Sequence, residues 1–406
     1  MDDMLLAFSR MAEPVRLGCI LILGFVLAAG MNAMTYALAW NCRAIGPWLR
    51  ADGEAPARRI WDFVPILGWW GLRRESSIHG RGYWIRPLLV DLLTPLGLVA
   101  LYLWELRGGL LDARGIEPLL VHQQFVRHAV LLCLMLVATL IDLDEKTIPD
   151  SITIPGMLWG LFFAAFWPQS GLPVLMGPLD LSSPAKWPAA LDGVAGWLVG
   201  CGSLWFWCMA MVLPRRLWLK GGFVKALRYL IARIFRYSYW HWIAFAGVAG
   251  TLGIHFVWRA SGPRWQALLS SLVGMLFGMV LVWTVRIIAS RALRKEALGF
   301  GDVTLMAMLG AHLGWQPTLL VFFIAPFAGA VMAIAQWLVT REHEIAYGPY
   351  LCLGALIVLL AWPALWDRWG LLFALGGWIP MILVVCLVLM ALMLVGWRRL
   401  SGGRTT

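Results

Sequence analysis

Long apolar stretches, separated by short polar ones, run through most of the sequence. A helix needs about 20 apolar residues to cross the hydrocarbon core of a bilayer. The pattern therefore predicts an all-α fold, a polytopic integral membrane helix bundle with about 11 transmembrane helices. They are expected at residues 17–40, 87–104, 125–141, 152–167, 189–213, 240–258, 265–288, 302–316, 317–340, 350–366 and 371–397.

Composition supports a membrane protein. Of the 406 residues, 61% are hydrophobic and 14% are charged, whereas a soluble domain is about 45–50% apolar and about 25% charged. The 26 tryptophans suit the two membrane interfaces, where amphipathic rings are enriched. Residues 1–16 lack the basic region of a cleavable signal, so the first span is predicted to be retained.

The net charge of +11 is explained by orientation in the membrane rather than by nucleic-acid binding, because the basic residues cluster between apolar spans. If eleven spans alternate, four basic groups fall on one side, which the positive-inside rule makes the cytoplasm. This arrangement predicts an external N-terminus and a cytoplasmic C-terminus. The segment 214–239 mixes basic and aromatic residues and reads equally as an interfacial amphipathic helix or as a plain anchor. The four groups lie in 41–86, 214–239, 286–295 and 398–404.

Two aspartates at the ends of predicted spans are the strongest candidates for chemistry. Asp142 follows Ile141 at the end of the third span, and Asp302 opens the eighth. A carboxylate at membrane depth costs at least ~2.5–3.5 kcal/mol and is a functional hypothesis by default. The charge-derived topology places both aspartates at the same, cytoplasmic face. Aspartyl proteolysis needs such a pair: an ionised carboxyl takes a proton from water, and a protonated one polarises the scissile carbonyl.

The neighbouring residues receive structural interpretations. Asp144, with Glu145 and Lys146, reads as a solvated turn, and Asp150 or Ser151 is expected to cap the next helix. Near the second aspartate, Gly299 and Gly301 are predicted to let the backbone bend and approach a substrate, or else to pack helices.

The motifs around the two aspartates resemble those of type IV prepilin peptidases, which are membrane aspartyl proteases of the GxGD class. Asp142 is followed six residues later by Ile148-Pro149-Asp150, and Asp302 ends the tetrad Gly299-Phe300-Gly301-Asp302. The resemblance makes Asp142 and Asp302 the catalytic pair and Gly299 and Gly301 active-site backbone. Further similar stretches are 62–69, 86–91, 305–311, 313–315, 347–350 and 353–355.

The sequence also departs from the family. Many members carry two zinc-binding CxxC pairs in the first loop; here Cys42 is the only loop cysteine, so we predict no zinc and no other cofactor. The loop is expected to dock at the membrane surface through Trp61, Phe63, Trp69, Trp70 and Trp84. Thr304 stands where many members carry lysine. The two aspartates are 160 residues apart (302 minus 142), which is far more than usual in the family.

These departures shape the expected domain organisation. Residues 1–104 would hold the N-terminal span, the Arg-rich cytoplasmic loop 41–86 and a second span. Residues 105–406 would form the membrane peptidase domain, with an inserted segment at about 168–288.

The resemblance implies an aspartic endopeptidase of the bacterial cytoplasmic (inner) membrane, with its active site facing the cytoplasm. It would cleave the basic leader from type IV prepilins or pilin-like subunits of type II secretion, with those precursors and the lipid bilayer as its partners. N-methylation of the new N-terminus stays open. Three alternatives also stay open: a presenilin-like intramembrane protease, a non-catalytic relative that binds pilins, and a proton- or cation-coupled transporter using both aspartates. Transporter sites usually lie near the bilayer midplane, however, rather than at one face.

Overall fold

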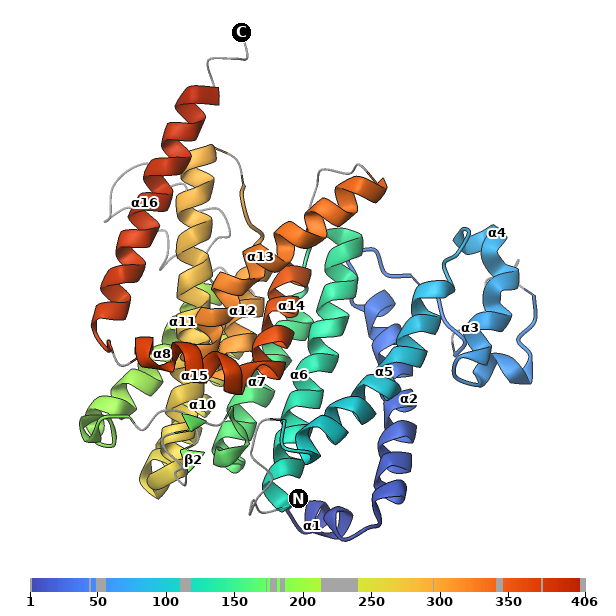
Figure 1. Ribbon diagram of the computed structural model, residues 1–406, viewed down its shortest axis with the longest axis horizontal. Coiled ribbons are helices and arrows are strands. Elements are labelled where there is room, and N and C mark those ends of the chain that lie inside the picture. Colours follow the sequence, from blue (N-terminus) through green and yellow to red (C-terminus); the bar gives the residue numbers. More distant parts are fainter. Residues whose placement is uncertain are drawn as a thin grey trace.

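Helices make up almost all of the chain that the computed structural model describes (Figure 1), namely residues 2–43, 45–48, 56–109, 118–172, 174–175, 181–182, 187–212, 240–294, 296–340, 346–373 and 375–401. Within these residues the only strands are β1 (Val174–Leu175) and β2 (Leu181–Ser182), which pair antiparallel. The predicted all-α, polytopic membrane bundle is therefore confirmed.

Seven helices among the described residues are long and apolar enough to cross a membrane, and eight if one bent pair counts as a single span. The bent pair is α14 (Gly348–Leu360) and α15 (Trp362–Phe373). Three other apolar helices are too short for this test over the residues described in full: α7 (Asp150–Phe166), α12 (Phe300–Leu313) and α13 (Trp315–Thr340, to Val331). The count of eleven spans thus stays a prediction. The seven are α2 (Glu13–Ala37), α5 (Ile85–Leu106), α6 (Pro118–Glu145), α8 (Val194–Val212), α10 (Trp240–Ala260), α11 (Gly262–Leu293) and α16 (Trp378–Ser401).

The span predicted at 350–366 is wrong at its end. Helix α14 stops at Leu360, and α15 turns away from it by 93°. Proline at position 363 explains the break, because a proline disfavours helical backbone in the residue before it and supplies no backbone N–H. Trp366 of α15 then stacks on Phe373, with ring centroids 5.7 Å apart.

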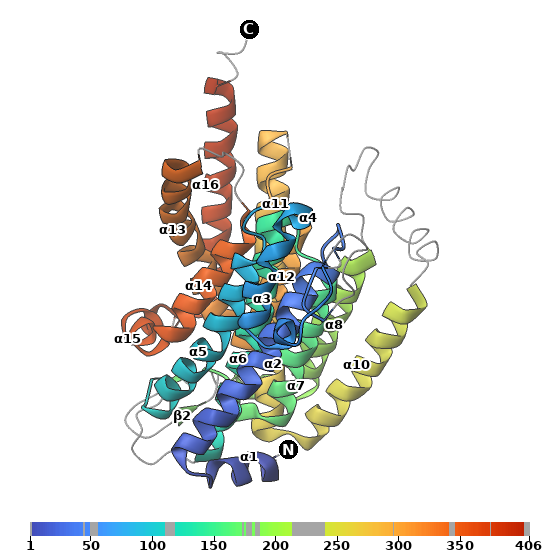
Figure 2. The same cartoon turned by 90° about the vertical axis from the view of Figure 1, so that its right-hand side faces the viewer.

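One end of the bundle carries the Arg-rich loop 56–86 and the arginines in the last turns of α11 and α16. The C-terminal ends of α2, α6, α11 and α16 lie there with the start of α5 and the short helices α3 (Leu67–Leu72) and α4 (Ser76–His79) (Figures 1 and 2). Helix α1 (Asp2–Ser9), the start of α6 and the β hairpin lie at the opposite end. The predicted interfacial helix at 214–239 falls outside the described residues.

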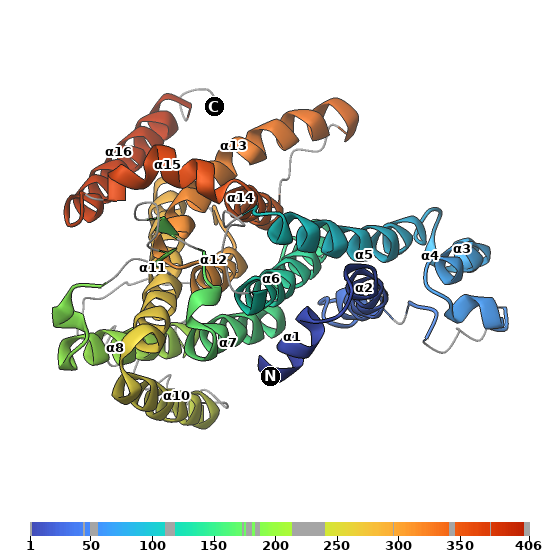
Figure 3. The same cartoon turned by 60° about the horizontal axis from the view of Figure 1, so that its bottom comes forward.

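Helix α12 is the buried centre of the larger part of the bundle, between α6, α7, α11, α13 and α14 (Figure 3). Every residue from Asp302 to Leu313 is buried. Two neighbours approach it closely because they present glycine, and glycines spaced four apart are typical of membrane helices that pack backbone to backbone. A Cβ atom at Gly274 would lie only 2.3 Å from the carbonyl oxygen of Gly310. The glycine pairs are Gly156 and Gly160 on α7, and Gly274 and Gly278 on α11.

The loop after α2 is folded by two buried ion pairs. Arg74 binds the carboxylate of Asp62, and Arg58 binds Glu75; both acids are only 1% exposed. The hydrogen bonds from Arg74 are the main reason that the pKa of Asp62 lies below its usual range. Trp69 packs inside this loop rather than on the membrane, since it is 3% exposed. Membrane docking by the loop's other aromatic side chains stays a prediction.

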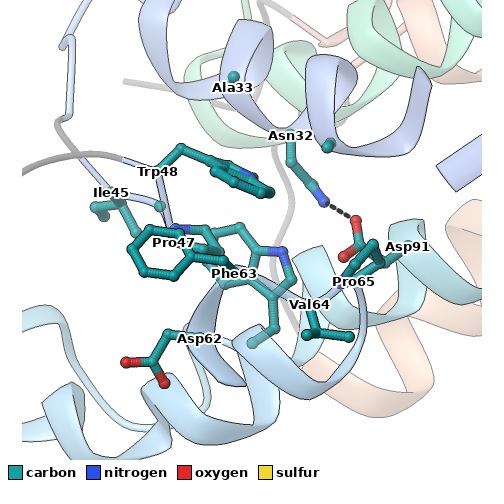
Figure 4. Close-up of a pocket in the computed structure, with 13 residues that line it drawn as sticks. Asn32, Ala33, Ile45, Pro47, Trp48, Asp62, Phe63, Val64, Pro65 and Asp91 are labelled. Carbon is teal, nitrogen blue, oxygen red and sulfur yellow. Dashed lines mark hydrogen bonds between the residues drawn. The ribbon is translucent and has the colours of Figure 1, made fainter. Parts of the chain in front are cut away.

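The same loop is fastened to the membrane helices through Asp91 of α5. One oxygen of Asp91 accepts a hydrogen bond from the side chain of Asn32 in α2 at 2.8 Å, and the other accepts the N–H of Ile66 at 3.2 Å. Figure 4 shows the hydrogen bond between Asn32 and Asp91 beside a small pocket of about 80 Å³, which is walled largely by apolar side chains such as Trp48 and Phe63.

Candidate active site

Asp142 lies in the last turn of α6 and is 4% exposed. Its Oδ2 atom accepts a hydrogen bond of 3.0 Å from the backbone N–H of Gly348, the first residue of α14. This bond crosses 206 positions of sequence and fixes the direction of the carboxyl group. The chain leaves the helix directly afterwards, because Lys146 adopts a positive φ of 53°.

Asp302 lies in the first turn of α12 and is 6% exposed. Its Oδ2 atom accepts a hydrogen bond of 3.2 Å from the backbone N–H of Gly299, the N-cap residue. A carboxylate in this position also meets the positive end of the helix dipole. The tetrad 299–302 therefore folds as the N-terminus of a buried helix.

The fold brings the two predicted aspartates together. Their carboxyl groups lie within electrostatic reach of one another. Gly301 explains how the two motifs come so close: a Cβ atom there would lie 3.0 Å from both the backbone nitrogen and the carbonyl oxygen of Ile148. Gly299 has an ordinary φ of −67°, so its backbone does not require glycine. An approach of either glycine to a substrate stays a prediction.

Arg286 supports the second motif, although the sequence suggested only a role in membrane orientation. It is 7% exposed on α11, and its Nε donates to the carbonyl of Leu298 at 2.9 Å. It also pairs with Glu296 at 2.7 Å and lies over the ring of Phe300. These contacts hold the chain that leads into α12. The signal in the sequence was an arginine inside an apolar span, where charge is costly.

The predicted solvated turn after Asp142 is only partly right: Asp144 and Lys146 are exposed, but Asp144 and Glu145 still belong to α6. Both acids also hold the N-terminal region. Glu145 accepts the backbone N–H groups of Trp40 and Asn41. Asp144 pairs with Arg86 at 2.5 Å. The end of α6 is thereby joined to the segment after α2 and to the start of α5.

The predicted helix cap at position 150 or 151 is also wrong. Pro149 occupies the N-cap position of α7, and Asp150 is the first helical residue. Its negative charge still suits the N-terminus of a helix.

Two hydroxyl groups lie near the second aspartate. Thr304, which is fully buried, donates to the carbonyl of Gly301 at 3.1 Å and so closes the first turn of α12. Tyr347 directly precedes α14; burial, with a smaller contribution from the charge of Asp302, raises the pKa of its phenol to about 12. That hydroxyl therefore stays protonated at neutral pH.

Replacing Glu145 with alanine should loosen the segment after α2. Two solvent-exposed hydrogen bonds would be lost, each contributing about 0.5–1.5 kcal/mol. Opening of the segment should then rise by about tenfold or more, since 1.4 kcal/mol corresponds to a factor of ten. The rate of trypsin cleavage after Arg43 measures this opening. Glu13→Ala serves as the control; equal rates in the two variants would contradict the assigned role of Glu145.

The fold and site define an integral membrane protein with two buried carboxyl groups held on neighbouring helices. The profile of the type IV leader peptidase family matches residues 129–235 and 233–334, about half of the chain and including both aspartates. The chain belongs to the type IV leader peptidase family.

Individual relatives match over shorter stretches. The chain is 34% identical over 112 residues to the prepilin leader peptidase/N-methyltransferase of Aeromonas salmonicida (strain A449), which covers 27% of this chain and 37% of that protein. It is 39% identical over 93 residues to the protein of the same name in Escherichia coli (strain K12), covering 22% and 41%.

A third relative matches over more of its length. The type 4 prepilin-like proteins leader peptide-processing enzyme of Escherichia coli O78:H11 is 30% identical over 159 residues, covering 37% of this chain and 57% of that protein. The chain thus matches less than two thirds of each relative. No solved structure matches it.

Proposed function

We propose that this protein removes the basic leader from type IV prepilins, or from pilin-like precursors of type II secretion, by hydrolysing one peptide bond. The observation that carries the proposal is the pairing of Asp142 with Asp302: two segments far apart in sequence meet with both carboxyl groups buried. Membership of the type IV leader peptidase family supports the substrate class.

The geometry suits water activation by a carboxyl pair. One ionised carboxyl group takes a proton from the attacking water, while its protonated partner polarises the scissile carbonyl. Two such groups in a low-dielectric site favour the state in which they share a single proton. The N–H groups of Gly348 and Gly299 orient the two carboxyls, and no covalent intermediate is needed.

The placement of the site suits a leader that stays in the cytoplasm. The end of α6 and the start of α12, which hold the two aspartates, lie toward the end of the bundle that carries the basic loop and the arginines of α11 and α16 (Figure 1). By the positive-inside rule, this end faces the cytoplasm of a bacterial inner membrane. The same rule keeps a basic leader inside, so its junction with an apolar helix would lie at the membrane edge beside the carboxyl pair.

The domain organisation proposed from the sequence is compatible with this placement. Residues 1–104 supply α2, the ion-paired loop and α5, and residues 105–406 supply both aspartates. Helices α8 and α10 belong to the inserted segment and pack against α11 and each other.

The proposal is tested with purified protein in proteoliposomes and a precursor that has a basic leader, a glycine and an apolar helix. Mass spectrometry should find one cut after the glycine, and replacing the leader's lysines and arginines with serine should slow cleavage. A cut inside the apolar helix that ignores the leader would favour a presenilin-like protease. If no precursor is cut but protons or cations are transported, the transporter alternative would replace this proposal.

Cleavage should not depend on zinc. The loop that carries zinc-binding cysteine pairs in many family members is folded here by Arg58–Glu75 and Arg74–Asp62. A pre-incubation with EDTA or 1,10-phenanthroline should therefore leave the initial rate within about twofold of the untreated value, since a structural zinc site would need about four N or S ligands. A chelator that abolishes cleavage, with recovery on adding zinc, would show that a metal takes part.

A further inference from the structure

Helix α12 is shorter than the hydrocarbon core of a membrane is thick. Its 14 residues, at about 1.5 Å each, span about 21 Å of a hydrocarbon core about 30 Å thick. With Asp302 near one face, the C-terminal end of α12 must lie at membrane depth. The last four carbonyl groups of a helix have no partner within it, and lipid supplies none. This end of α12 therefore needs donors from other helices.

Arg127 on α6 provides such a donor. It is 4% exposed, and its guanidinium donates to the carbonyl oxygen of His312, in the last turn of α12. The same group donates to the hydroxyl of Ser170 at 3.2 Å, and that hydroxyl donates to the carbonyl of Trp167 at 2.7 Å. A charged side chain at this depth is costly, so its placement calls for a function.

The side chain of His312 ties the same end of α12 to a second neighbour. Its Nε2–H donates to the carbonyl of Gly156 on α7 at 2.9 Å, and the residue is 1% exposed. The C-terminal end of α12 is thus bonded to α6 and to α7. Along the rest of its length, α12 meets glycine faces, whose van der Waals contacts are less directional than hydrogen bonds.

The dipole of α12 is complemented by a charged side chain at each end of the helix. A helix carries roughly half a positive charge at its N-terminus and half a negative charge at its C-terminus. Asp302 lies at the first, and the guanidinium of Arg127 contacts the second. Asp302 moves with α12, whereas Arg127 belongs to α6, so the contact of Arg127 with the C-terminus is the one that resists a displacement of α12 along its axis.

We propose that Arg127 and His312 are positioning residues that fix α12 along its axis and so hold Asp302 beside Asp142. This inference rests on the proposed function for its catalytic consequence, although the positioning itself can be measured without any activity. Neither residue touches the carboxyl pair, so both act through the helix.

The first experiment measures position directly. In protein whose native cysteines are replaced by alanine, the Asp142→Cys/Asp302→Cys variant is treated with a short bis-maleimide, whose two groups each add to one cysteine thiol. Adding Arg127→Gln should lower the cross-linking yield at least fivefold, whereas Arg127→Lys should retain most of it. The matched control is Arg16→Gln, because Arg16 bonds Tyr102, which is not part of α12 or its anchor. Equal yields with and without Arg127→Gln would overturn the proposal.

A milder variant covers the case in which Arg127→Gln does not fold. His312→Leu keeps a buried side chain and removes the bond to α7, so it should lower the cross-linking yield at least twofold. A cross-linking yield equal to that of the Asp142→Cys/Asp302→Cys variant without this change would show that His312 is not a positioning residue.

The second experiment measures catalysis in the otherwise unaltered protein. Arg127→Gln should lower kcat at least tenfold with KM within twofold, and should narrow the pH–rate profile, because carboxyl groups held farther apart perturb each other less. A pH–rate profile of Arg127→Gln equal to that of the wild type, with a loss of activity that matches the loss of folded protein, would show that Arg127 only stabilises the fold. If the wild type cuts no precursor, the proposed function fails while the cross-linking result still decides the positioning.

Discussion

Asparagine in place of either Asp142 or Asp302 should stop leader cleavage, with a loss of about 10³-fold or more. Asparagine keeps the shape of the side chain and can still accept the N–H of Gly348 or of Gly299. It cannot take a proton from water or present one to the scissile carbonyl. The loss should therefore fall on kcat, and each variant should elute like the wild type in size-exclusion chromatography.

Asp150→Asn is the matched control for this loss. Asp150 lies in the same loop region but begins α7 rather than joining the carboxyl pair. Its replacement should keep the initial cleavage rate within about threefold, since a charge in the first turn of a helix contributes only about 0.3–1 kcal/mol to stability. Loss of cleavage in this variant, with Asp142→Asn active, would move the catalytic role to Asp150.

Gly348→Ala should give the second largest effect, a fall in kcat of about a hundredfold, the scale expected when a reacting group is misplaced by 1 Å. A Cβ atom at this position would lie 2.6 Å from Oδ2 of Asp142 and 2.7 Å from Cδ1 of Ile148. Real Cβ contacts are never this short, so α14 or the carboxyl group must shift. The hydrogen bond that orients Asp142 would then be broken.

The control for this substitution is Gly202→Ala on α8, where a Cβ atom would meet nothing within 4 Å. Alanine is the better helix former, so this change should leave both folding and cleavage intact. The test compares the initial rates and KM of the two variants on one precursor. A Gly348→Ala variant as active as Gly202→Ala would mean that the Gly348–Asp142 contact does not govern catalysis.

The sequence predicted the features that depend on composition and order along the chain. Long apolar runs predict a membrane bundle because a bilayer-spanning helix must be apolar, and the spacing of the basic loops predicts that Asp142 and Asp302 lie at one face. The structure holds their carboxyl groups within electrostatic reach of one another, on the neighbouring helices α6 and α12. Their shared cytoplasmic face stays a prediction.

Features that depend on tertiary partners were not predictable in the same way. Glu145 reads as a solvated residue because nothing local shows that the N–H groups of Trp40 and Asn41, about a hundred positions away, lie against it. The role of Arg286 depends on a turn that exists only after the fold forms. Arg127 was equally hidden, since its acceptor on His312 lies 185 positions along the chain.

The central claim is that Asp142 and Asp302 act as one catalytic unit. The most direct test is to measure initial cleavage rates for the wild type, Asp142→Asn, Asp302→Asn and the double variant in one proteoliposome preparation. Groups that act as a unit give losses that do not multiply. We expect both single variants to lose activity by about 10³-fold or more and the double variant to be no slower than either. A folded single variant that retains more than about a tenth of the wild-type rate, or single losses that multiply in the double variant, would contradict the account.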